Sequence, residues 1–163
     1  MSTQSKTQAI KAPWLPPRWF IRSAWAFHKA YFRVTGGRRG LWKPAPGKWG
    51  TMRVTTVGRK SGKQRVVILG YYEDGSNLVT LAMNGWGDPE PAWWLNMQAE
   101  PEVRVELRGS DQTMRGRIAQ GEERDRLWAL WRGHGHGDSL DGWASHRSRE
   151  TAVVVLEPVE RTF

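Results

Sequence analysis

The sequence predicts a mostly β protein in which six largely antiparallel strands form a barrel with short helices inserted. Stretches of alternating or β-branched apolar residues recur along the chain, and glycine-containing turns separate them. Strands joined by turns at this spacing close into a barrel more readily than they stay open. With 163 residues, of which 39% are hydrophobic, the chain is long enough to bury a core.

Six segments carry the strand signal, either as period-two alternation or as a short apolar run bounded by turn residues. They are Met52–Val57, Val66–Tyr72, Leu78–Ala82, Val103–Leu107, Met114–Ala119 and Thr151–Leu156. The last of them is almost continuously apolar, which is typical of a strand buried on both faces. Turn residues predict chain reversals at Gly58–Gln64, Glu73–Asn77 and Gly109–Gln112.

Two helices are expected among these strands. Ala92–Gln98 follows Pro91, which is favoured at a helix start, and Pro101 ends it. Glu122–Trp131 has acidic residues in its first turn, as the helix dipole favours. The glycine-rich stretch Gly133–Gly142 is expected to be a loop, and its two histidines lack a third metal ligand at a defined spacing. We therefore predict no metal site.

A third helix is predicted at Trp19–Val34, where aromatic and aliphatic side chains lie opposite a basic stripe. Two interpretations fit this pattern: the helix covers the barrel core, or it binds an anionic membrane surface. We assign residues 1–50 to an arm, this helix and a linker, and residues 51–163 to the barrel domain. No apolar run reaches the roughly 20 residues of a spanning helix. A cytoplasmic protein is expected, either free or at the inner face of the membrane.

The charge balance points to an anionic partner. The net charge is +9 and the pI is near 10.5, which suits nucleic acid, a membrane surface or a charged small molecule. Cysteine is absent, which excludes a disulfide framework and a thiol nucleophile, and no G-x-S-x-G nucleophile elbow occurs. An enzyme with this sequence would need a bound cofactor for its chemistry.

The densest cluster of charge is Val57–Val67, VGRKSGKQRVV, which reverses the chain between the first two predicted strands. Arginine forks match phosphate oxygens, and glycine lets the backbone approach a ligand closely. The glycine spacing differs from a P-loop, because three residues and not four separate Gly58 from Gly62. The pattern predicts an anion site, and a solvated basic hairpin tip is the alternative. The cations are Arg59, Lys60, Lys63 and Arg65.

Three blocks in order carry a family resemblance. They are TTVGRKSGKQRVV, then LAMNGWGDPEPAWWLNMQAEPEV, then GEERDRLWALW followed by ETAVVVLEP. Together they closely resemble the deazaflavin-dependent nitroreductase family of actinobacteria, whose members use coenzyme F420. The resemblance runs from Thr51 to Pro158 and implies a split β-barrel. Because this fold also accepts flavin mononucleotide and a basic hairpin could bind either phosphate, the choice of F420 rests on the resemblance and not on the charge.

The resemblance also implies which residues bind the cofactor. The hairpin would grip the phosphodiester and acidic glutamyl tail, and a second segment would lie along the deazaflavin ring. The implied tail-binding residues are Arg59, Lys60, Ser61, Gly62 and Arg65. The implied ring-side residues are Ile68, Ala82, Met83, Asn84, Gly85, Trp86, Trp93 and Asn96, with Trp93 as a packing wall.

The chain departs from the family pattern around the substrate. Met83 replaces a serine of the ring loop, Gly70 replaces a tyrosine, and Trp143 is the one aromatic residue left in a segment that is tyrosine-rich in the family. Met83 and Gly70 imply a roomier, less polar substrate pocket, and Trp143 is the third residue assigned to it. The resemblance implies hydride transfer from reduced F420 to an electron-poor acceptor, such as a quinone, an activated enone or lactone, or a nitroaromatic. The alternatives are a non-catalytic deazaflavin or lipid binder and a single-stranded nucleic-acid binder.

Overall fold

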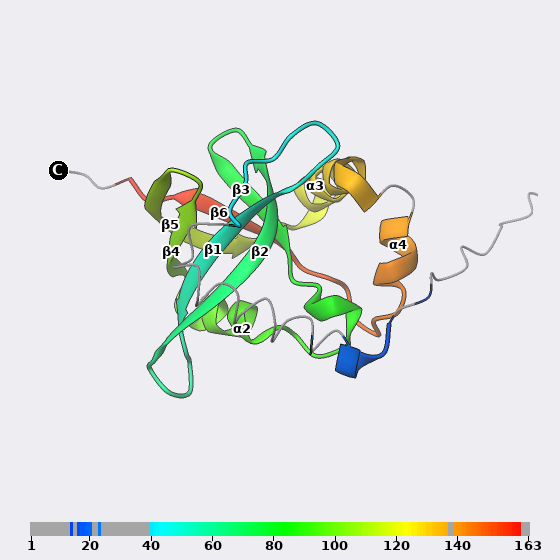
Figure 1. Ribbon diagram of the computed structural model, residues 1–163, viewed down its shortest axis with the longest axis horizontal. Coiled ribbons are helices and arrows are strands. Elements are labelled where there is room, and N and C mark those ends of the chain that lie inside the picture. The colour runs from blue at the N-terminus through cyan, green and yellow to red at the C-terminus, as the bar shows by residue number, and fades with distance from the viewer. Residues whose placement is uncertain (1–13, 15, 21–22, 24–39, 137–138, 161–163) are drawn as a thin grey trace, which may run out of the picture.

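Six strands of the computed structural model close a barrel in which every neighbouring pair is antiparallel (Figure 1). The structure describes residues 14, 16–20, 23, 40–136 and 139–160. The order around the barrel is β1-β2-β3-β6-β5-β4, and β4 returns to β1. The strands are β1 Gly50–Val57, β2 Gln64–Asp74, β3 Asn77–Leu81, β4 Glu102–Leu107, β5 Ser110–Ile118 and β6 Val153–Pro158. The predicted fold class is confirmed.

Alternation along the strands builds two cores. Val54, Leu69 and Met114 point into the barrel, where Trp94 and Met97 of helix α2 (Ala92–Ala99) join them. Figure 1 shows α2 lying across one end of the strands. The inward side chains and α2 therefore fill the barrel interior.

The second core lies outside the barrel, between strands β3 and β6 and helix α3 (Gly121–Trp131). Val153 and Val155 face this outer core, whereas Val154 and Leu156 face the inner one. All four are buried, so the sequence-based prediction of a strand covered on both faces is confirmed.

The stretch expected to be a glycine-rich loop is largely helical, so that prediction was wrong. Helix α3 continues into a π-helical turn, Arg132–His136, and helix α4 covers Ser139–Ala144 (Figure 1). The Asp141 carboxylate accepts hydrogen bonds from Trp128 Nε1 at 2.7 Å and from an Arg132 Nη at 2.6 Å. These contacts, with the full burial of Leu140, stabilise α4 against α3 and outweigh the low helix propensity of Gly142.

Two predicted turns are shorter than expected. Leu107 pairs with Ser110, so the β4–β5 reversal uses only Arg108 and Gly109, and Gly109 supplies a φ of +91°. Asp74 likewise pairs with Asn77, which leaves Gly75 and Ser76 as the turn. The predicted helix Trp19–Val34 lies almost entirely outside the described residues.

A bidentate ion pair joins the end of β2 to α3. Arg126 donates to both oxygens of Asp74 at 2.9 Å, and this hydrogen-bonded guanidinium holds the pKa of the Asp74 carboxyl below its usual value. Since the folded-state pKa is depressed, the pair stabilises the fold above the ordinary aspartate pKa of about 3.9. That stabilisation is lost as the pH falls through the lower, folded-state value.

We therefore expect Asp74→Asn to lower the free energy of unfolding near neutral pH by less than about 1 kcal/mol, because the pair is partly exposed. The gap to the wild type should begin to close below about pH 5 and continue to close as the pH falls below about 3.9. Urea unfolding at each pH measures it, with the exposed Glu73→Gln as the control. A gap that stays constant with pH would contradict the role of this pair.

Candidate functional site

The reversal between β1 and β2 is a rigid loop, Gly58–Lys63. Gly58 N donates to Lys63 O at 2.8 Å, and Gly62 N donates to Gly58 O at 2.7 Å. A Cβ on Gly58 would lie 2.8 Å from Ser61 Oγ, and Gly62 has a φ of +64°. Both positions therefore favour glycine, one for space and the other for backbone conformation.

The four cations predicted to form an anion site all lie on this loop or just after it. Arg59, Lys60, Lys63 and Arg65 are exposed, and none forms an ion pair within the part of the chain that the structure describes. Most other arginines of the barrel pair with a carboxylate, as Arg53 does with Glu106. The loop thus presents positive charge on a fixed backbone, as a multiply anionic ligand requires.

Helix α2 holds the hairpin through a buried amide. Asn96 Oδ1 accepts from Arg59 N at 3.2 Å and from an Arg59 Nη at 3.3 Å, and Asn96 Nδ2 lies 3.3 Å from Thr56 Oγ1. Asn96 is only 5% exposed. The side chain that the resemblance implied as a cofactor contact therefore hydrogen-bonds the hairpin itself, and it orients Arg59.

Replacing this amide should destabilise the fold. In Asn96→Ala, the Arg59 amide loses its side-chain acceptor and the buried Thr56 hydroxyl loses one of its two partners, so the free energy of unfolding should fall by about 1–3 kcal/mol. Urea unfolding measures the change, and Gln98→Ala, an exposed position on the same helix, should have little effect. Equal stability of the two variants would show that the amide contributes nothing.

The second candidate segment connects β3 to α2. Residues Asn84, Gly85 and Trp86 form a single 3₁₀ turn in which all three have positive φ, at 46°, 59° and 63°. For a residue with a Cβ this conformation costs on the order of 1–3 kcal/mol, and such strain gathers at functional sites. Trp86 N donates to Met83 O at 2.7 Å, and the Trp86 ring is buried while Asn84 is exposed. We call residues Ala82–Asp88 the ring loop.

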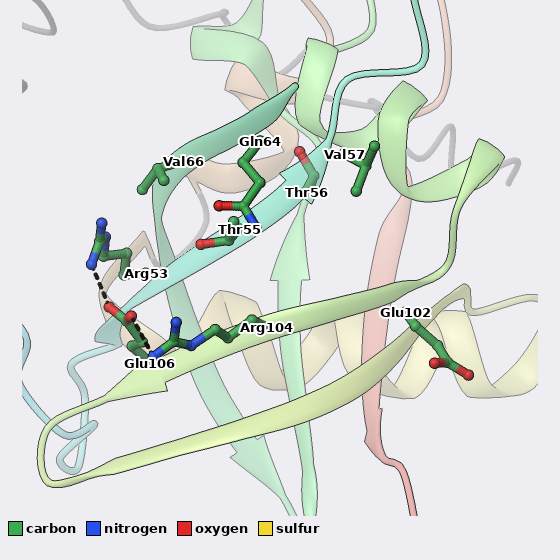
Figure 2. Close-up of a pocket in the computed structure, with 9 residues that line it drawn as sticks. All are labelled: Arg53, Thr55, Thr56, Val57, Gln64, Val66, Glu102, Arg104 and Glu106. Carbon is green, nitrogen blue, oxygen red and sulfur yellow. Dashed lines mark hydrogen bonds and ion pairs between the residues drawn. The ribbon is translucent and has the colours of Figure 1, made fainter. Parts of the chain in front are cut away.

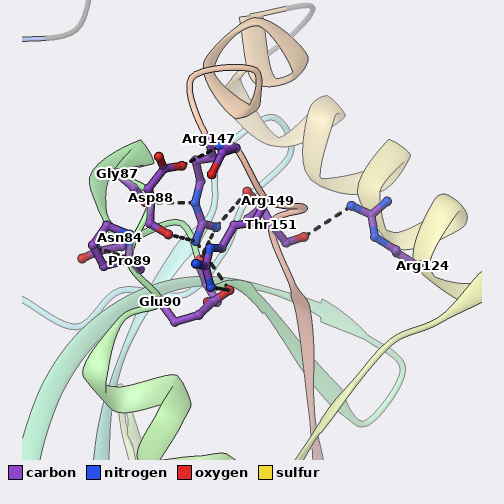
Figure 3. A network of polar contacts seen from close by, with 11 residues as sticks. Asn84, Gly87, Asp88, Pro89, Glu90, Arg124, Arg147, Arg149 and Thr151 are labelled. Carbon is purple, nitrogen blue, oxygen red and sulfur yellow. Dashed lines mark hydrogen bonds and ion pairs between the residues drawn. The ribbon is translucent and has the colours of Figure 1, made fainter.

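The ring loop is held by a residue that the sequence did not single out. Arg147 donates to Ala82 O at 2.8 Å and to Gly87 O at 2.9 Å, and Figure 3 shows Arg147 beside Gly87. In the sequence, Arg147 stands in a run of polar residues and resembles its exposed neighbour Arg149. No local pattern separates the two, because only the fold buries one of them.

The three residues implied for the substrate pocket lie on the outer side of the barrel. Met83 and Trp143 both pack against the outer core, and the Trp143 and Trp86 rings are 6.1 Å apart. Gly70 faces Trp49: a Cβ there would lie 3.0 Å from the Trp49 ring. The expected extra room at Gly70 is therefore absent, because the Trp49 indole fills it.

Two further predicted residues flank these elements. Ile68 is half-buried on β2, two positions before Gly70 and on the same face of the strand. Trp93 packs against the inner core with its ring centroid 6.2 Å from that of Trp94, and its role as a wall of the cofactor site stays a prediction. The structure thus brings Met83 and Trp86 of the ring loop together with Trp143 at the outer core, and α2 contacts the hairpin through Asn96.

A separate groove of about 270 Å³ lies on the outer face of β1, β2 and β4 (Figure 2). It is lined by Arg53, Thr55, Thr56, Val57, Gln64, Val66, Glu102, Arg104 and Glu106. Glu106 pairs with Arg53 at 2.6 Å and lies 3.5 Å from Arg104. The charges of the groove neutralise one another, and the predicted substrate-pocket residues Gly70, Met83 and Trp143 do not line it. We therefore do not assign this groove to the site.

Comparison with known proteins identifies the family of the chain. A family model described as F420H(2)-dependent quinone reductase matches residues 26–158. An F420H(2)-dependent quinone reductase of Mycobacterium tuberculosis is 30% identical over 132 residues, which are 79% of this chain and 86% of the relative.

Solved structures agree as well. An F420-H2 dependent reductase, FDR-A, superposes with a TM-score of 0.58 at 28% identity, over 66% of this chain and 93% of that chain. A chain solved as a domain-swapped dimer gives a TM-score of 0.62 at 25% identity, over 83% and 99% of the two chains. The resemblance drawn from the sequence is confirmed: the chain belongs to the F420H(2)-dependent quinone reductase family, oxidoreductases that take their electrons from reduced coenzyme F420.

Proposed function

We propose that this protein reduces a quinone-type acceptor, with the hairpin holding the charged tail of F420 and the ring loop lying along its deazaflavin. The observation that carries the proposal is that α2 connects the two segments. The ring loop is followed, after Pro89–Pro91, by Ala92 at the start of α2, and Asn96, about one helical turn later, hydrogen-bonds the hairpin. Figure 1 shows α2 between these two segments.

The hairpin fits the charge of such a ligand. F420 carries a phosphodiester and glutamyl carboxylates. Four exposed cations without ion-pair partners among the described residues lie on the loop or just after it. Lys60 and Arg65 would hold the tail by charge-assisted hydrogen bonds, and Gly62 would let the backbone approach it. A flavin mononucleotide offers one phosphate and would use fewer of these charges.

The chemistry would come from the cofactor, which when bound and reduced supplies a hydride. This hydride, which carries two electrons, and one proton together convert a quinone into a hydroquinone. The protein would orient the two partners and exclude water. Met83 and Trp86 of the ring loop, together with Trp143, form an apolar, aromatic wall, which suits a flat hydrophobic acceptor. Backbone N–H groups of the fixed ring loop would stabilise the charge that develops on the acceptor.

A titration tests this proposal. Oxidised F420 is added to the purified protein and the fluorescence of F420 is followed. Flavin mononucleotide and a short single-stranded oligonucleotide are titrated in parallel at the same fixed salt concentration. Saturable binding that prefers F420 is expected, followed by oxidation of reduced F420 with menadione as acceptor. F420 binding without turnover would favour the hypothesis of a non-catalytic deazaflavin-binding protein. Tight oligonucleotide binding without F420 binding would favour the hypothesis of a single-stranded nucleic-acid-binding protein.

We also propose that the N-terminal arm and the helix predicted at Trp19–Val34 bring the site to an anionic membrane surface. Their described residues include the exposed Trp14, Trp19 and Phe20, at 79%, 69% and 53%. Arg18 lies against the ring loop, since a Cβ on Gly87 would be 2.6 Å from an Arg18 Nη. Exposed aromatic rings beside cations are typical of membrane-interface segments. No helix among the described residues has the length and apolar character needed to cross a bilayer.

Flotation with vesicles tests the arm. The full chain should float with vesicles that contain anionic phospholipid, and the variant Trp14→Ser/Trp19→Ser/Phe20→Ser should float much less. The matched control is Trp42→Ser, an exposed tryptophan outside the arm. Equal flotation of all three proteins would remove the membrane proposal and leave the quinone reductase proposal untouched.

A further inference from the structure

The ring loop is closed at its neck by one buried guanidinium. The Arg147 side chain is 0% exposed. It donates to Ala82 O, where the loop leaves β3, and to Gly87 O, where the loop returns; Figure 3 shows Arg147 beside Gly87. These two carbonyls belong to residues five positions apart in the chain. A single side chain therefore fixes the distance between the two ends of the loop.

The remaining contacts of Arg147 lock the guanidinium in its plane. It donates to Thr151 Oγ1 at 3.0 Å and to Asp88 O at 3.4 Å, and its charge faces the Glu90 carboxylate at 3.6 Å. The next residue along, Ser148, donates its backbone N–H to the Asp88 carboxylate. The segment that carries Arg147 thus fastens the far side of the loop at several points.

Such fastening accounts for the strained backbone within the loop. Asn84 and Trp86 both have positive φ, which residues with a Cβ adopt only where the surroundings enforce it. Only arginine offers donors in a planar fork that reaches two carbonyls and a hydroxyl together, whereas a lysine ammonium is a compact point charge. The chemistry of the side chain and the geometry of the loop therefore match.

We propose that Arg147 is a positioning residue, which sets the conformation of the ring loop for the deazaflavin without touching the cofactor. The inference rests on the proposed function, because it takes the ring loop to be the deazaflavin site. It assigns Arg147 to the ring end of the site, whereas Lys60 and Arg65 act at the tail end. The two ends should therefore respond differently to substitution and to salt.

The test compares Arg147→Lys with Arg149→Met, which removes an exposed arginine that approaches the same Glu90 carboxylate at 3.8 Å. In Arg147→Lys, the Kd for F420 should rise about tenfold, as the loss of charge-assisted hydrogen bonds predicts. The slope of log Kd against log salt should be unchanged, because the hairpin cations remain. At saturating F420, the factor by which kcat with menadione falls should be about ten times the factor by which KM for menadione changes. Arg149→Met should behave as the wild type.

Chemical rescue adds a readout that lost stability alone would not move. In Arg147→Ala, guanidinium chloride at about 20 mM should restore part of the lost kcat, and sodium chloride at the same concentration should not, because only guanidinium reproduces the forked donors. If neither alanine nor lysine variant folds, Thr151→Val removes one acceptor of Arg147 and should raise the F420 Kd by a smaller factor.

The outcomes separate the two proposals. A wild type that fails to bind F420 overturns the proposed function and this inference with it. A wild type that binds F420, with Arg147→Lys folded and unchanged in both Kd and kcat, overturns the inference alone. If both arginine variants fail to fold and Thr151→Val binds F420 as the wild type does, the inference is also overturned. A change in the salt slope of Arg147→Lys would place Arg147 at the tail end instead.

Discussion

The double substitution Lys60→Ala/Arg65→Ala is expected to weaken F420 binding about 100-fold or more, because two charge-assisted contacts to the tail are each worth about 1.5–3 kcal/mol. Both side chains are exposed and form no ion pair among the described residues, so the fold does not depend on them. The midpoint of thermal unfolding should therefore stay close to that of the wild type.

A matched control separates the local site from the overall charge. Lys43→Ala/Lys48→Ala removes the same charge from two exposed positions outside the hairpin, and its F420 affinity should stay within a few-fold of the wild type. Fluorescence titration at two salt concentrations gives all three affinities. If the two double variants lose affinity equally, the hairpin is no specific site and long-range attraction alone governs binding.

Trp131→Ala should produce the largest loss of stability, about 3–5 kcal/mol, since it leaves a cavity in the outer core. Trp131 is 1% exposed and stacks on Trp49 with ring centroids 6.4 Å apart and planes at 9°. It also lies 5.3 Å from the Tyr72 ring. For a chain of this size each kcal/mol lowers the unfolding midpoint by about 2–4 °C, so the midpoint should fall by about 10 °C.

The neighbouring residue provides the control for this prediction. Leu130 is 39% exposed on the same helix, and Leu130→Ala should change the unfolding midpoint by only about 1–2 °C. Differential scanning calorimetry of the three proteins measures both effects. A midpoint for Trp131→Ala near that of Leu130→Ala would mean that the outer core tolerates the cavity, and that α3 is held by its polar contacts.

The barrel could be predicted because its strands are defined by local patterns. Thr151–Leu156 is apolar on both faces, and Val54, Leu69 and Val105 alternate with side chains outside the inner core, so strand position and burial follow from period two. The basic hairpin could also be found, because its glycines and cations are contiguous in the chain. Features of this kind need no knowledge of what lies across the fold.

The features that the sequence did not reveal all depend on distant partners. Helix α4 forms because Asp141 is bound by Trp128 and Arg132, which outweighs the low helix propensity of the glycines. The space beside Gly70 is closed by Trp49, a residue of the preceding linker. Arg147 is buried only because the ends of the ring loop meet around it. Long-range contacts of this kind produce no periodic pattern in the sequence.

The position of β6 has a consequence for how the protein folds. This strand pairs with β3 on one side and with β5 on the other, although it is the most C-terminal of the six. Until it is in place, β3 and β5 present unpaired backbone edges, and the barrel cannot close. Pairing between segments so far apart in the chain is slow, and the waiting edges favour self-association. Folding during synthesis should therefore be delayed until β6 has left the ribosome.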